Sequence, residues 1–190
     1  MNEDSFIRAL QNKERTAYSQ LLDNYQDLVY GTCLSFVPNR EDAEDIAQEV
    51  FVEVFRSVHS FKGNSKLSTW IYKISVSKCL QFIRKKNAKK RFVFLESLSG
   101  RETPIDRTWF YTNFDHPGVL LENKETSETL FKAVDKLPDD QRTAFTLVKI
   151  DGLSYQETSE IMKKSVSSIE SLLFRARKNL KKYLSEFYKK

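Results

Sequence analysis

The sequence has few of the residues that hold small stapled or metal-bound domains together. It contains two cysteines, Cys33 and Cys79, and two histidines, His59 and His116. The cysteines lack CxxC spacing and lie among apolar neighbours, so we expect two buried, reduced thiols. The histidines have no triad or metal-ligand spacing, and there is no glycine-rich phosphate loop. We therefore expect no metal, no cofactor, no catalytic residue and no enzyme activity.

Glycine and proline are also scarce, with five and four residues. This scarcity argues against a sandwich or barrel, which needs many tight turns. No apolar run is long enough to cross a membrane, and the acidic start, MNED, is unlike a signal peptide. We expect a cytoplasmic protein that is not inserted into a membrane.

Nearly every periodic segment has the apolar spacing of a helix, which predicts an all-α protein. We expect two small helical domains, 1–96 and 123–190, joined by an extended linker at 97–122. Glycines and prolines interrupt the linker. It also holds four aromatic residues, Trp109, Phe110, Tyr111 and Phe114. These aromatics indicate that the linker rests in a groove of the protein or of a partner.

A helix-turn-helix pattern lies near the C-terminus. Residues 154–157 (SYQE) have the form of a capping box, and the helix they open ends near Met162. Lys163 and Lys164 form a tight turn, and Ser165 can cap a long final helix. An apolar seam follows that helix, with Ser and Arg opposite it, which suits base edges and phosphates in a major groove. The alternative is the solvated face of an ordinary helical hairpin.

The stretch 62–91 carries many Lys and Arg residues and no Asp or Glu. Its cations suit phosphates, and its aromatics, Trp70, Tyr72 and Phe82, could stack on unpaired bases. Trp70 follows a loop that could receive an extruded base. Core packing is the alternative for each aromatic; we favour it for Phe82 and leave it open for Trp70 and Tyr72.

An acidic amphipathic helix is predicted at 40–56, with no Lys or Arg between its flanking arginines. The helix dipole accounts for acids near its start, but not for Glu49 and Glu53. Its outward row consists of Asp42, Asp45, Gln48 and Glu49. A surface of this sign should face a basic partner, and a nucleic acid is not one.

These motifs resemble regions 2 and 4 of bacterial sigma factors. Residues 42–51 (DAEDIAQEVF) resemble the core of region 2, and 61–74 resemble its continuation. Residues 137–142, 152–158 and 174–180 resemble region 4. The order of the motifs and the two-domain length are similar to those of the extracytoplasmic-function group of the sigma-70 family.

The resemblance implies a subunit that binds core RNA polymerase and directs it to promoters. The acidic helix would dock on the clamp of the largest subunit, through Asp42, Asp45, Gln48 and Glu49. Melted DNA of the −10 element would meet Lys62, Asn64, Ser65, Lys66, Trp70, Lys73, Lys78 and Arg84. The −35 duplex would meet Ser165, Ser167, Ser168, Glu170, Ser171, Phe174, Arg175, Arg177, Lys178 and Lys181. The resemblance leaves open whether an anti-sigma factor is a further partner.

The chain departs from the family pattern at three positions. Family members often have a basic residue in place of Glu170 or Leu172, and glycine in place of Lys163. Glu170 could accept a hydrogen bond from a cytosine amino group or repel a phosphate. Two other functions remain as alternatives. One is a stand-alone helix-turn-helix regulator, which would need no acidic docking surface; the other is a helical adaptor with no nucleic-acid role.

Overall fold

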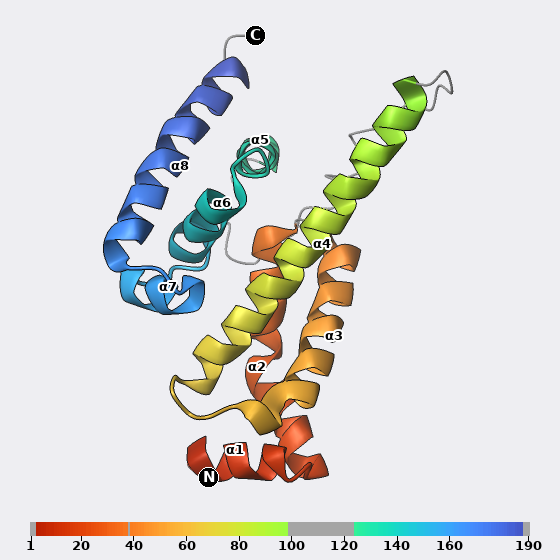
Figure 1. Cartoon of the computed structure of the whole chain (residues 1–190), viewed down its shortest axis with the longest axis vertical. Coiled ribbons are helices and arrows are strands. Elements are labelled where there is room, and N and C mark those ends of the chain that lie inside the picture. Colours follow the sequence, from red (N-terminus) through yellow and green to blue (C-terminus); the bar gives the residue numbers. More distant parts are fainter. Residues whose placement is uncertain (1–2, 38, 99–123, 188–190) are drawn as a thin grey trace.

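The structure, a computed structural model, describes residues 3–37, 39–98 and 124–187 (Figure 1). Every regular element in these ranges is helical, which confirms the all-α prediction. The aromatic residues of the predicted linker lie outside the described residues, so their placement in a groove of the protein or of a partner stays a prediction. No helix in the described ranges has the length and apolar character needed to cross a membrane.

The N-terminal unit is a helical bundle. Its elements are α1 (Glu3–Gln11), α2 (Arg15–Phe36), α3 (Arg40–Ser57), the 3-10 turn η1 (Val58–Ser60) and α4 (Leu67–Leu98). Helices α2, α3 and α4 pack against one another, and α1 lies across one end of the bundle (Figure 1). The apolar stripes of these helices meet in one continuous core. The loop 61–66 joins η1 to α4.

The C-terminal unit is built around its last helix. Its elements are α5 (Lys124–Val134), α6 (Asp139–Phe145), the π-helical turn η3 (Thr146–Ile150), α7 (Tyr155–Met162) and α8 (Val166–Phe187). Helix α8 contacts α5, α6 and α7. Its buried seam consists of Ile169, Leu173, Ala176 and Leu180.

The helix-turn-helix forms through the local signals that the sequence predicts. Ser154 and Glu157 complete the capping box, with the Glu157 amide donating to Ser154 Oγ at 3.2 Å and the Ser154 amide donating to Glu157 Oε2 at 2.9 Å. Lys163 takes a left-handed conformation with φ 53° and ends α7. Ser165 Oγ accepts the Ser168 amide at 3.2 Å, which caps α8. The turn and both caps are therefore confirmed.

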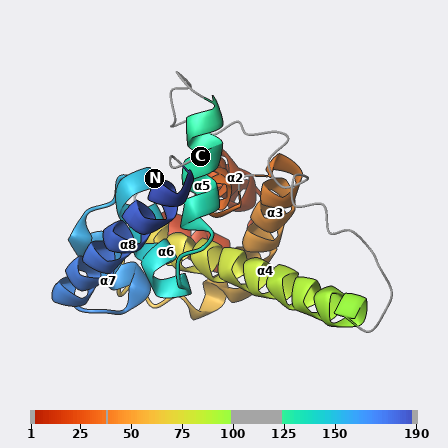
Figure 2. The same cartoon turned by 90° about the horizontal axis from the view of Figure 1, so that it is seen from above.

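The two units share a core. Leu147 of η3 and Ile161 of α7 belong to the same buried cluster as the N-terminal helices, and Leu153 and Met162 pack against it. Helix α7 contacts α4, and η3 contacts α2, so the C-terminal unit rests on the side of the bundle (Figure 2). Part of the apolar surface of the helix-turn-helix is thus covered by the N-terminal unit.

Two polar contacts accompany this apolar interface. Ser35 Oγ of α2 donates to Asp151 Oδ1 at 2.5 Å, and Arg84 Nε of α4 lies 3.0 Å from Asp139 Oδ2 of α6. Burial raises the pKa of Asp151 to about 7, although the hydrogen bond from Ser35 acts to lower it. The interface therefore holds a carboxyl group that titrates near neutral pH.

Candidate functional site

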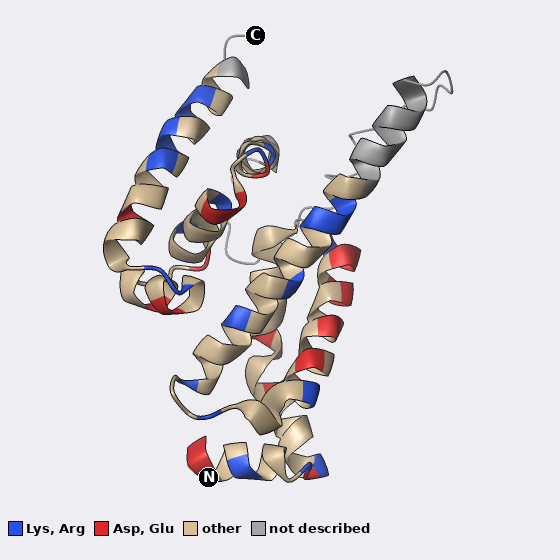
Figure 3. Cartoon of the chain, in the orientation of Figure 1, with Lys and Arg blue, Asp and Glu red and all other residues tan. Residues whose placement is uncertain are grey.

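An acidic surface covers the outward face of α3. Asp45, Gln48 and Glu49 are all exposed, and their spacing of three and four residues places them side by side on one face. Figure 3 shows acids along α3, on the side away from α2 and α4. The exposed Val52 continues this row by one turn, with 54% of its surface accessible. The structure thus brings three of the four predicted docking residues together.

Asp42, the fourth predicted docking residue, has a different environment. Its Oδ2 lies 2.6 Å from Lys86 Nζ of α4, and both side chains are only about one-fifth exposed, at 20% and 19%. Glu53 and Lys78 form a second ion pair between the same helices, at 3.1 Å. Part of the charge asymmetry in the sequence is therefore neutralised within the protein, where α3 packs on α4.

The loop 61–66 presents basic and polar side chains to solvent. Lys62, Asn64 and Lys66 are exposed, and Ser65 is half-buried. Gly63 has φ +71°, a conformation that favours glycine. The structure therefore places the loop residues predicted to meet −10 DNA together on one exposed turn.

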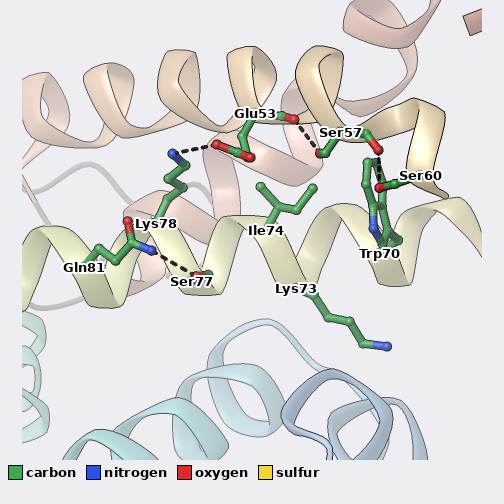
Figure 4. Close-up of a pocket in the computed structure, with 9 residues that line it drawn as sticks. All are labelled: Glu53, Ser57, Ser60, Trp70, Lys73, Ile74, Ser77, Lys78 and Gln81. Carbon is green, nitrogen blue, oxygen red and sulfur yellow. Dashed lines mark hydrogen bonds and ion pairs between the residues drawn. The ribbon is translucent and has the colours of Figure 1, made fainter. Parts of the chain in front are cut away.

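Trp70 lies just beyond the loop, on the first turns of α4. The side chain is half-buried, and its ring centroid is 5.2 Å from that of Phe61. One edge of Trp70 lines a hollow of about 450 Å³ between α3 and α4 (Figure 4). The residues that line it are Glu53, Ser57, Ser60, Trp70, Lys73, Ile74, Ser77, Lys78 and Gln81. Trp70 therefore contributes both to the core and to an open site.

The hollow adds polar residues that sequence reasoning missed. Ser77 and Gln81 follow Trp70 and Lys73 at helical spacing, on the exposed side of α4, and Ser57 of α3 lines the same hollow near Trp70 (Figure 4). Gln81 Nε2 donates to Ser77 Oγ at 3.4 Å. Hydroxyl and amide groups beside two lysines suit both base edges and phosphates. Helical spacing could have indicated that Ser77 and Gln81 lie on the same face of α4 as Trp70 and Lys73. Nothing in the sequence indicated that α3 contributes to the hollow.

Two residues predicted to meet −10 DNA, Lys66 and Arg84, lie close to acids of the C-terminal unit. Arg84 forms its ion pair with Asp139. The pKa of Glu157 is lowered, first by hydrogen bonds from Ser154 and then by the positive charge of Lys66. Tyr72, which the sequence left open, is half-buried, and its pKa is raised by burial and by the nearby Asp151. Tyr72 thus belongs to the interface between the units.

Helix α8 presents an exposed face opposite its buried seam. The residues predicted to meet the −35 duplex are all exposed: Ser165, Ser167, Ser168, Glu170, Ser171, Phe174, Arg175, Arg177, Lys178 and Lys181. Phe174 is 71% exposed and is the most exposed large apolar side chain among the described residues. The face combines hydroxyl, carboxyl, aromatic and guanidinium groups on one α-helix, an element that the major groove of DNA admits.

The cysteines are free and buried. Contact with Cys33 and burial hold the pKa of the Cys79 thiol well above its usual range, so that thiol is a poor nucleophile. The described part of the chain contains no group of His, Cys, Asp or Glu side chains arranged to hold a metal ion.

Comparisons with known proteins agree with this arrangement. Residues 21–89 match the family model for sigma-70 region 2, and residues 127–180 match a model for sigma-70 region 4. The chain is 33% identical to the ECF RNA polymerase sigma factor SigW of Bacillus subtilis, over 95% of each chain. It is 30% identical to the ECF RNA polymerase sigma-E factor of Haemophilus influenzae, over 93% of this chain and 92% of that protein.

Solved structures share the fold. One is the sigma factor RpoE in complex with the anti-sigma factor NepR from Bartonella quintana, with a TM-score of 0.61 and 22% identity, over 88% of this chain and 96% of that one. Another is CnrH in complex with the cytosolic domain of CnrY, with a TM-score of 0.64 and 18% identity, over 97% of each chain. A stand-alone helix-turn-helix regulator is not favoured, because region 2 is present together with region 4. The chain belongs to the extracytoplasmic-function group of the sigma-70 family, the RNA polymerase sigma factors that direct promoter-specific transcription initiation.

Proposed function

We propose that this sigma factor docks on the clamp of the largest polymerase subunit through the exposed row of Asp45, Gln48 and Glu49. The observation that carries the proposal is the exposure of this row on α3, inside the segment matched by sigma-70 region 2. Among the described residues, neither the Asp45 nor the Glu49 carboxylate takes part in an ion pair. Asp42 enters the interface only if its pair with Lys86 opens.

The docking test is a charge reversal on this row. Asp45→Lys together with Glu49→Lys should abolish co-purification with core polymerase while helix content stays unchanged. Asp23→Lys with Asp27→Lys is the matched control, because these exposed acids on α2 have the same spacing and give the same charge change. If the α3 double variant still co-purifies with core, the docking surface lies elsewhere.

We propose that the loop 61–66 and the outward side of α4 hold the melted −10 element. Lys62, Asn64, Ser65 and Lys66 would contact the strand, and Trp70, Lys73 and Lys78 would line its path along the hollow. Arg84 would contribute after leaving Asp139. Trp70→Ala should impair opening of a duplex promoter more than binding to a pre-melted one. Equal loss on both templates would mean that Trp70 serves only the core.

We propose that α8 reads the −35 duplex, with Ser167, Glu170, Ser171, Phe174 and Arg175 nearest the bases. The phosphates would be bound by flanking cations and by serines at the start of α8. These residues are Arg177, Lys178, Lys181, Ser165 and Ser168. A base-reading residue should cost about 1–3 kcal/mol when removed and relax specificity at one position. A phosphate contact should weaken all promoters alike and lower the salt slope by about one unit.

The −35 test compares substitutions within this face. Arg175→Ala should change which −35 sequences are used, whereas Lys181→Ala should change only strength and salt dependence. Glu170→Arg should shift preference toward a guanine-containing site, because arginine pairs bidentately with guanine. An unchanged −35 preference in the Glu170→Arg variant would remove Glu170 from the reading face.

We further propose the domain division 1–96, 97–122 and 123–190, a cytoplasmic location beside the polymerase, and no catalytic activity in the chain itself. An anti-sigma factor is a proposed partner because a protein of the same fold was solved with one. A gel shift separates this function from a stand-alone regulator. The chain should bind promoter duplex weakly alone and strongly with core polymerase.

A further inference from the structure

Helix α1 lies before the segment matched by sigma-70 region 2, which begins at residue 21. It is nevertheless part of the N-terminal core, because Phe6, Ala9 and Leu10 are buried in the same cluster as Val58 and Phe61. Helix α1 contacts η1 directly. It crosses the end of the bundle where η1 and the loop 61–66 turn into α4 (Figure 1).

Two polar side chains of α1 bind the two ends of this loop. Gln11 Nε2 donates to the carbonyl oxygens of Val58, at 3.3 Å, and Phe61, at 3.1 Å. Glu3 Oε1 accepts the amide of Leu67, the first residue of α4, at 3.1 Å. The loop is therefore tied at its entrance by the last residue of α1 and at its exit by the first.

Beyond the burial of Phe61 at its start, few contacts fix the conformation of the loop. Backbone hydrogen bonds reach its ends, from the Phe61 amide to Val58 and from the Trp70 amide to Lys66. In the described ranges, no backbone hydrogen bond joins two residues of the loop. The amides in the first turn of a helix have no partner within it, and an acceptor such as Glu3 also interacts favourably with the helix dipole. Gln11 and Glu3 thus supply bonds that the loop cannot make for itself.

We propose that Gln11 and Glu3 are positioning residues that set the shape of the loop 61–66 and thereby its selection of −10 DNA. This proposal rests on the proposed function of the loop. Neither side chain needs to touch DNA. Glu3 carries a charge that would repel a phosphate, which fits a role behind the loop rather than on its DNA-facing side.

The test uses the full chain with core polymerase and a set of promoters that differ only in the −10 element. Glu3→Ala should reduce discrimination between −10 sequences by about 2- to 10-fold, the range expected for one lost hydrogen bond. Gln11→Met, which removes two hydrogen bonds, should reduce it at least as much. Core binding and −35 preference should be unchanged. Glu3→Gln should restore discrimination, because its amide oxygen still accepts from Leu67.

Asp4→Ala is the matched control, since Asp4 is an exposed acid on the same turn of α1. It should behave as wild type. Hydrogen exchange at 61–67 gives a second readout, and it should quicken in Gln11→Met and Glu3→Ala but not in Asp4→Ala. Wild-type −10 discrimination in both α1 variants would overturn the proposal. A loss of activity that is equal on every promoter and parallels a lower melting temperature would also overturn it.

A loop variant keeps this failure distinct from failure of the proposed function. If Asn64→Ala alters −10 discrimination and the α1 variants do not, the positioning role alone is wrong. If Asn64→Ala with Lys62→Ala also leaves −10 discrimination unchanged, the loop does not read the −10 element and both proposals are wrong.

Discussion

The two units of this sigma factor differ in how they reconcile stability with binding. The N-terminal unit has one large core, and part of its basic surface is engaged by its own acids, in the pairs Lys86–Asp42 and Lys78–Glu53. Among its described residues, the C-terminal unit has two small clusters of its own, with five and three buried residues. Two more of its apolar side chains, Leu147 and Ile161, are buried in the core of its neighbour.

The difference shows that a broad exposed polar face and a self-sufficient core need not occur in the same unit. Helix α8 presents its whole predicted reading face to solvent, but the unit that carries it leans on the N-terminal bundle. The bundle has its own core, but Arg84, which we propose to contact DNA, forms an ion pair with Asp139 and would have to leave it to do so. Four tests address this contrast, ordered from the largest expected effect to the smallest.

The largest effect is expected from Leu147→Ala. Leu147 is fully buried, and truncation of such a residue costs about 2–5 kcal/mol. Because it packs in the neighbouring core, hydrogen exchange should quicken in α7 and α8 and also where α2 and α4 meet them. Leu180→Ala, in the unit's own cluster, is the control and should affect the C-terminal unit alone. Identical exchange maps for the two variants would contradict the contrast.

Asp151 should make the joint between the units sensitive to pH. Burial raises the pKa of Asp151 to about 7, so the packed interface between the units favours the protonated carboxyl group. The interface therefore becomes less stable as the pH rises from the ordinary pKa of an aspartate toward 7. The free energy of unfolding should fall by about 2 kcal/mol between pH 5.5 and 8. It falls by about 1.4 kcal/mol per pH unit up to the pKa near 7 and changes little above it. Tyr72 and Cys79 on α4 also lie near Asp151, and their pKa values are raised, so neither titrates in this window.

Asp151→Asn removes this titration and keeps an acceptor for Ser35. Its unfolding free energy, measured by urea denaturation, should be flat between pH 5.5 and 8 and exceed that of the wild type at pH 8. Asp27→Asn, an exposed acid on α2, is the control and should keep the wild-type slope. A wild-type slope in Asp151→Asn would show that another group governs the joint.

The ion pair between Lys86 and Asp42 should contribute a smaller amount. The pair is about four-fifths buried at 2.6 Å, so a double-mutant cycle with Lys86→Met and Asp42→Asn should give a coupling of about 1 kcal/mol. The exposed pair of Arg40 and Glu44 should give less than ~0.5 kcal/mol in the same cycle. Equal couplings would mean that packing of α3 on α4 does not strengthen the buried pair.

The smallest effect is expected at the turn of the helix-turn-helix. Lys163 has φ 53°, which glycine adopts without strain, so Lys163→Gly should raise stability by about 0.5–1 kcal/mol. Lys182→Gly, within α8, should instead lower it by about 1 kcal/mol. Thermal melting distinguishes the two. A destabilised Lys163→Gly variant would show that the lysine side chain holds the turn.

Local signals in the sequence predicted the parts of the fold that are determined locally. The capping box at Ser154, the turn at Lys163 and the cap at Ser165 each depend on residues a few positions apart. The exposed faces of α3 and α8 follow from helical spacing, which also predicted their buried stripes. All-α architecture needed no more than this.

Contacts between segments far apart in the chain could not be predicted from the sequence. The ion pair of Asp42 with Lys86 spans 44 residues, and periodicity places Asp42 outward without showing that α4 supplies a partner. The buried pocket for Asp151 depends on α2, 116 residues away. Gln11 has no signature at all, since its role comes from carbonyl groups that only the folded loop brings to it.

The core shared by the two units limits how modular this sigma factor is. An engineer who exchanges its promoter specificity by grafting another region 4 would replace Leu147, Leu153 and Ile161, the side chains that fill the neighbouring bundle. A graft limited to α8, the helix that we propose reads the −35 element, would keep that fit. A graft of the whole unit would replace the side chains that fill the neighbouring core. The boundary for swapping specificity therefore lies inside the C-terminal unit, at the surface of α8.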